Sequence, residues 1–116
     1  MSLATDRADR WLADLDASLR ASDELVSRGR EAFDGDPALP LAFEALANRV
    51  GDLSKRLVAH DPGRFHEIEF SLAAKNRDFV VHHYDRLDRE TLWQTVTRSF
   101  PTLHSLVRQH RSTARG

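Results

Sequence analysis

The 116-residue chain contains no cysteine, which excludes disulfide frameworks, thiolate metal sites and cysteine nucleophiles. It has no apolar run long enough to cross a bilayer, and its first residues lack the basic-then-apolar layout of a signal peptide. We therefore expect a cytoplasmic protein without a membrane partner. The formal net charge is only −1, so no global basic field attracts nucleic acid. Any contact with nucleic acid must come from a local patch.

Several common motifs are also missing. The sequence has no P-loop, no Rossmann glycine pattern and no His-Glu-x-x-His zinc motif. The histidines at positions 60, 66, 104 and 110 show no metal-ligand spacing with one another. We expect neither a metal site nor a cofactor.

What remains is an ordinary apolar and charged composition, 41% and 30% of the residues, in a chain of single-domain length. We expect one domain over residues 1–116, with a frayed polar tail at about 110–116. No segment shows sustained strand-type alternation. Apolar residues instead recur at helical spacing, with charged residues on the other side. The pattern predicts an all-α protein.

Four amphipathic helices are expected, separated by clusters of proline, glycine and aspartate. Their ranges are 6–33, 37–58 (starting at Pro37 or Pro40), 64–84, and from about Asp88 to the tail. Short connections between such helices predict an antiparallel four-helix bundle. Pro101 interrupts the last helix, so we expect a kink or break near Ser99-Phe100.

The third predicted helix is apolar on two opposite faces. The ordinary core stripe comprises Phe65, Ile68, Leu72, Phe79 and His83. A second group on the opposite face comprises Phe70, Ala74 and Val81, beside Arg77 and Tyr84. A helix with two apolar faces is usually buried twice. We therefore predict a homodimer that packs near Phe70, Ala74 and Val81. The alternative is that neighbouring helices of the same bundle cover both faces.

The same helix carries residues able to cleave RNA without a metal. A histidine can move the proton of the attacking 2′-hydroxyl or of the leaving oxygen, and a guanidinium can hold the phosphate oxygens as charge develops. Arg77 and His82 suit these roles, and Asp78 lies four residues before His82, where it could orient the imidazole. Arg77 and His82 are about 140° apart on an ideal helix. Either the helix distorts or ends near His82, or the two residues converge at a dimer seam.

Spacing alone is weak evidence, because most surface arginines are solvated or salt-bridged. Tyr84 alone would more often be an interface aromatic. His83 follows the motif histidine, but it lies on the core stripe, which favours His82 as the working imidazole.

The order Arg77, four residues, His82, one residue, Tyr84 resembles the R-x4-H-x-Y motif of HepT-type toxins in the HEPN superfamily. Residues 46–54, Leu92-Trp93 and 100–103 resemble other stretches of that family, so the similarity covers about residues 40–108. Family members often carry asparagine after the motif arginine, where this chain has Asp78. They also have a tryptophan at the start of the motif helix, which is absent here.

The resemblance implies a helical homodimer with Arg77 and His82 of both subunits at a shared cleft. It implies a metal-independent ribonuclease that is the toxin of a toxin–antitoxin pair, with RNA as substrate. The partner would be a minimal nucleotidyltransferase antitoxin that neutralises the toxin by AMP transfer to Tyr84. Two alternatives stay open: a non-catalytic HEPN module that binds a nucleotidyltransferase, and a plain dimerising bundle.

Overall fold

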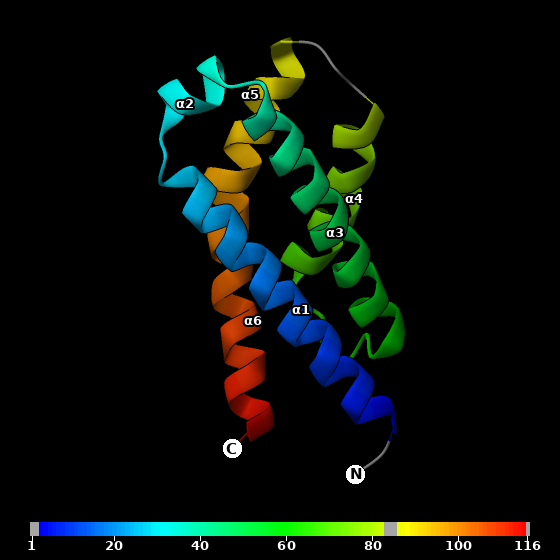
Figure 1. Cartoon of the computed structure of the whole chain (residues 1–116). Coiled ribbons are helices and arrows are strands. Elements are labelled where there is room, and N and C mark those ends of the chain that lie inside the picture. Colours follow the sequence, from blue (N-terminus) through cyan, green and yellow to red (C-terminus); the bar gives the residue numbers. More distant parts are fainter. Residues whose placement is uncertain (1–2, 83–85, 116) are drawn as a thin grey trace.

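The computed structural model describes residues 3–82 and 86–115, with side-chain surroundings for residues 6–75 and 89–113. The described residues form helices and no strand, which confirms the all-helical prediction (Figure 1). The helices are α1 (Leu3–Val26), α2 (Arg30–Gly35), α3 (Ala38–His60), α4 (Ile68–His82), α5 (Arg86–Gln94), the π-helical turn η1 (Thr95–Ser99) and α6 (Phe100–Arg115).

The helices surround one elongated core. Helix α1 packs against α3 and α6, and α4 lies mainly along α3 (Figure 1). The N-terminal end of α1 and the C-terminal end of α6 lie at the same end of the molecule (Figure 1). The apolar stripes predicted for α1, α3 and α6 face this core, and burying each large side chain contributes roughly 1.5–3 kcal/mol. The core includes Leu12, Leu15, Leu19, Phe43, Val50, Leu57, Leu103 and Val107.

The first predicted helix, residues 6–33, is wrong in one respect: it is broken at Gly29. Helix α1 ends at Val26, and Gly29 has φ 93° and ψ 167° before α2 begins at Arg30. Phe33 nevertheless reaches the core, where its ring lies 5.0 Å from that of Trp93 and 5.8 Å from that of Phe43. The apolar stripe resumes after the break, so the helical periodicity of the sequence gives no sign of the break at Gly29.

Replacing Gly29 with alanine should destabilise the protein by about 1–3 kcal/mol, since this backbone region is nearly exclusive to glycine. A Cβ at this position would meet no atom within 4 Å, so backbone strain is the only expected cost. Gly35→Ala is the matched control, because Gly35 also has open space but no positive φ. Urea unfolding that shows equal stability for the two variants would contradict the strain at Gly29.

The expected irregularity near Ser99-Phe100 is present as the π-helical turn η1. The Phe100 N–H donates to the carbonyl of Thr95, five residues back, and Pro101 supplies no N–H of its own. The hydroxyls of Thr95 and Thr97 donate to the carbonyls of Thr91 and Trp93 at 2.9 and 2.7 Å. The turn changes the direction of the last helix and presents Arg98 and Ser99 on its exposed side.

In the described N-terminal half of α4, the two faces are the reverse of the prediction; Phe79, Val81 and His83 lie outside the part of the chain whose side chains are described. Phe70, expected at a dimer interface, is fully buried within the chain, where its ring lies 5.5 Å from that of Phe65 and 5.7 Å from that of His110. Ile68 and Leu72, expected in the core, are 64% and 45% exposed. Helical periodicity identifies two apolar faces, but the surrounding aromatic side chains decide which one is buried.

Helix α6 continues to Arg115, through most of the stretch for which a frayed tail is expected. Two interactions hold this last part. His110 Nε2 lies 3.0 Å from Glu67 Oε1, and Arg111 Nη1 lies 2.8 Å from Asp16 Oδ2. The tail is thereby tied to the start of α4 and to α1.

Candidate functional site

The predicted catalytic residues lie in the C-terminal half of α4. The described helix includes positions 77, 78 and 82, whose side chains lie outside the described surroundings, and Tyr84 lies outside the described residues altogether. Helical geometry places Arg77 and His82 about 7.5 Å apart along the axis and about 140° apart around it. Asp78 and His82 are one turn apart on the same side of the helix.

The N-terminal half of α4 is firmly anchored in the protein. Phe70 packs in the aromatic cluster with Phe65 and His110, and Ala73 is 6% exposed. Glu67, just before the helix, accepts a hydrogen bond from His110. Burial alone would raise the pKa of Glu67, but this hydrogen bond and the nearby histidines lower it below its usual value. The C-terminal half of α4, which carries the motif positions, therefore continues from a half that is packed into the protein.

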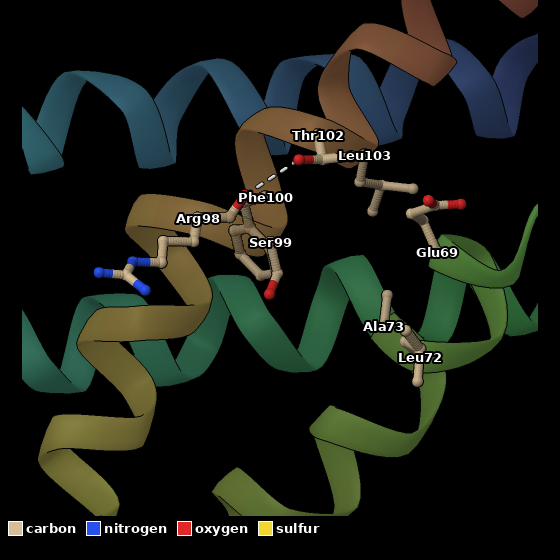
Figure 2. A pocket seen from close by; sticks show the side chains of 8 residues that line it. All are labelled: Glu69, Leu72, Ala73, Arg98, Ser99, Phe100, Thr102 and Leu103. Atoms are coloured by element: carbon tan, nitrogen blue, oxygen red, sulfur yellow. Dashed lines mark hydrogen bonds between the residues drawn. The ribbon is translucent and has the colours of Figure 1, made fainter.

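A groove of about 410 Å³ lies between α4 and the η1–α6 junction (Figure 2). One wall comes from α4 and the other from the π-helical turn and the start of α6. The lining residues are Glu69, Leu72, Ala73, Arg98, Ser99, Phe100, Thr102 and Leu103. Figure 2 shows the Ser99 side chain pointing into the space between the walls and Arg98 extending away from Leu103.

The groove adjoins the predicted site along the helix. Position 77 follows Ala73 by four residues, so it lies one turn further along the same face of α4. Arg98 on the opposite wall is exposed and has no ion-pair partner among residues whose side chains are described. The apolar walls carry the Glu69 carboxylate, the Arg98 guanidinium and two hydroxyl groups, so the groove can accept a polar ligand beside the motif helix. The sequence analysis missed Arg98, whose only signal was its position just before Pro101.

A second cluster of charged groups joins α1 to α6, and the sequence analysis missed it too. Asp16, 3% exposed, lies 2.8 Å from His104 Nε2 through Oδ1. Its Oδ2 lies 3.0 Å from Arg20 Nη2 and 2.8 Å from Arg111 Nη1. Burial alone would raise the pKa of Asp16, but the His104 hydrogen bond and the charges of Arg20, His104 and Arg111 lower it. Asp16 is therefore an ionised carboxylate with both oxygens occupied.

His104 is 2% exposed and meets charged groups through both ring nitrogens. Its Nε2–H donates to Asp16, while Nδ1 lies 3.1 Å from Asp23 Oδ2 and 3.2 Å from Arg108 Nη2. A neutral Nδ1 accepts a hydrogen bond from Arg108, whereas a protonated Nδ1 donates to Asp23. No sequence motif links these residues, because α1 and α6 are far apart in the chain.

Other kinds of site are not evident in the described part of the chain. Within residues whose surroundings are described, no three histidine, aspartate or glutamate side chains group as metal ligands. No helix among the described ranges is both long and apolar enough to span a membrane.

Comparison with known proteins connects the motif to a family. The profile described as "Ribonuclease HepT-like" matches residues 15–110, which include Arg77, His82 and Tyr84. The chain is 25% identical over 79 residues to a protein named "Putative RNase TTE0752" from Caldanaerobacter subterraneus subsp. tengcongensis, covering 68% of this chain and 70% of that one. No solved structure matches the chain. Since the profile covers most of the sequence, the chain belongs to the HepT-like ribonuclease family of the HEPN superfamily.

Proposed function

We propose that this protein is a metal-independent endoribonuclease and the toxin of a toxin–antitoxin pair. The observation that carries the proposal is the match of the ribonuclease family to residues 15–110, a range that includes Arg77, His82 and Tyr84. The family name and the name of the matched protein both indicate a ribonuclease. The groove between α4 and the η1–α6 junction supplies a surface on which RNA can reach that helix.

The proposed chemistry is attack of a ribose 2′-hydroxyl on the neighbouring phosphorus. His82 moves the proton of the attacking hydroxyl or of the leaving 5′-oxygen, being titratable near neutral pH. Arg77 holds the phosphate oxygens as negative charge develops on them, because its guanidinium stays charged and matches their geometry. Asp78, one turn before His82, orients the imidazole. The products are a 2′,3′-cyclic phosphate and a free 5′-hydroxyl.

The opposite directions of Arg77 and His82 on one helix favour a site completed by a second subunit. We propose a homodimer of four-helix subunits whose contact uses Ile68 and Leu72, the exposed apolar pair on α4. Position 79 continues the same face of the helix. This surface replaces the predicted one, because Phe70 is buried within its own subunit.

Leu72→Glu is expected to shift the protein toward monomer in analytical ultracentrifugation, since it places a charge in the proposed contact. Leu41→Glu is the matched control, because Leu41 is also a strongly exposed leucine but lies on α3. A dimer that survives Leu72→Glu unchanged would rule out this surface.

Neutralisation is proposed to occur by AMP transfer to Tyr84 from ATP, catalysed by a minimal nucleotidyltransferase. The tyrosine oxygen attacks the α-phosphorus and pyrophosphate leaves. The added nucleotide brings bulk and negative charge next to the motif, which would repel an RNA phosphate. Mass spectrometry after co-expression with the cognate nucleotidyltransferase should show at least one added adenylate. Tyr84→Phe should remove the addition, and an unmodified wild-type chain would contradict this step.

Expression in a bacterium tests the function as a whole. The wild-type chain should arrest growth, and His82→Ala and Arg77→Ala should each restore it. Harmless expression of all three proteins at equal levels would favour the second candidate, a non-catalytic HEPN module that binds a nucleotidyltransferase. The near-neutral charge of the chain, −1, is the observation that keeps this candidate open, because it gives RNA no long-range attraction.

A further inference from the structure

A second cavity, away from the α4 groove, lies between α1 and α6. It measures about 270 Å³ and is lined by Asp16, Arg20, Arg108, Arg111 and Ser112. The lining therefore contains three guanidinium groups, one hydroxyl group and one carboxylate. Counting side chains alone, the lining carries three positive charges and one negative charge.

Asp16, the carboxylate in the lining, holds two of the arginines in place but does not neutralise the positive charge of the cavity. Both oxygens of Asp16 are engaged, Oδ1 by His104 and Oδ2 by Arg20 and Arg111. Each guanidinium has five N–H donors, so Arg20 and Arg111 keep most of theirs after meeting Asp16. The buried carboxylate holds the two guanidinium groups at the mouth of the cavity, which reduces the ordering cost of binding an anion there.

Arg108 is the least committed of the three arginines. Its described contact is with His104 Nδ1, at 3.2 Å, a nitrogen that also lies 3.1 Å from Asp23. Its side chain is exposed on α6, one turn before Ser112. A guanidinium whose described contact is an imidazole nitrogen, in a solvent-facing position, is suited to a phosphate oxygen.

We propose that this cavity binds a backbone phosphodiester of the RNA substrate, at a site separate from the cleavage motif. The inference rests on the proposed function, which supplies RNA as the ligand. With a net charge of −1 the whole chain does not attract RNA, so a local cluster of this kind is what binding requires. Figure 1 places the motif end of α4 and the C-terminal half of α6 toward opposite ends of the molecule. An RNA that contacts both sites therefore runs along a protein whose longest extent is 48 Å.

The test measures binding of a labelled single-stranded RNA to the full chain in a His82→Ala background, at several salt concentrations. Arg20→Gln combined with Arg108→Gln removes two contacts while Arg111 and His104 continue to hold Asp16. The cavity takes one phosphodiester, so the loss of that contact should lower the salt slope by about 0.7 on a single strand. At 0.1 M salt this corresponds to roughly 5-fold weaker binding.

Two comparisons separate this site from a general charge effect and from a folding defect. Arg28→Gln with Arg56→Gln removes two exposed, ion-paired arginines elsewhere and should leave the slope nearly unchanged. Arg20→Lys with Arg108→Lys keeps both charges and should retain most of the slope. Inorganic phosphate, followed by NMR, should perturb the Ser112 amide and the Arg111 side chain, both in the cavity lining, in the parent and not in the double Gln variant.

Cleavage assays in a background that keeps His82 distinguish the proposed second phosphate site from the proposed ribonuclease function. Arg20→Gln with Arg108→Gln should weaken cleavage of long RNA but not of a dinucleotide, whose single phosphodiester cannot occupy both sites. An unchanged salt slope, in a protein that still cleaves RNA, overturns the second site and leaves the proposed function standing. Loss of nucleotidyltransferase binding with an unchanged slope overturns it as well, because the cluster would then be a protein interface. Absence of any RNA binding or cleavage by the parent chain overturns both claims.

Discussion

Purified His82→Ala is expected to cleave RNA 10²- to 10⁴-fold more slowly than the wild-type chain. This is the range over which a positioned acid or base accelerates proton transfer. His82 lies in the C-terminal half of α4, beyond Phe70 and Ala73, the residues through which this helix joins the described core. The observed rate constant should be measured in single-turnover experiments with excess protein, which isolate the chemical step from product release.

His83→Ala is the matched control for this prediction. It removes the neighbouring imidazole from the same stretch of sequence, and the sequence pattern favours His82 as the working residue. Cleavage should therefore fall far less in His83→Ala than in His82→Ala. A larger loss in His83→Ala would exchange the two assignments, and equal small losses would remove histidine from the mechanism.

Asp16→Ala is expected to destabilise the protein by about 3 kcal/mol, because it leaves buried His104 and partly buried Arg111 without their shared acceptor. Because the Arg20 side chain is 71% exposed, solvent screens its pair with Asp16. We therefore expect a smaller loss of stability than the largest losses seen when fully buried ion pairs are broken. For a chain of this size the melting temperature should fall by roughly 12 °C. Asp14→Ala is the control, since the Asp14–Arg49 pair is exposed and 4.0 Å apart, and it should change stability by less than about 0.5 kcal/mol.

The stabilising role of Asp16 should also depend on pH. Its pKa in the folded protein is lower than the usual 3.8, so its contribution is fully present above that pH. The contribution is lost as the pH falls through the lowered pKa, where the carboxyl becomes protonated. Unfolding of wild type and Asp16→Asn should therefore differ most near neutral pH and converge below about pH 4. A constant difference across this range would contradict the ion-pair account.

Much of the fold could be predicted from periodicity and breakers. The start of α3 beside Pro37 and the irregular turn before Pro101 both follow from the missing N–H of proline. The break at Gly29 could not be found in this way, because Phe33 restores the apolar stripe beyond it. The contacts of His110 with Glu67 and of Arg111 with Asp16 could not be found either, because they join residues far apart in the chain.

The candidate site was predictable only along one helix. Sequence order placed Arg77, Asp78 and His82 on a single element, which the structure describes as α4. It did not indicate which face of that helix is buried, because Phe70 and Ile68 are equally apolar and differ only in their tertiary neighbours. Contacts between helices, such as Asp16 with His104 or the groove beside Arg98, leave no trace in local spacing.

Cleavage of a labelled RNA by the purified wild-type chain in excess chelator tests the central claim most directly. The account predicts cleavage that persists without divalent metal, fragments ending in a 2′,3′-cyclic phosphate, and loss of those fragments in both His82→Ala and Arg77→Ala. Wild-type protein that leaves the RNA intact, or alanine variants that cleave it as fast as wild type, would contradict the account.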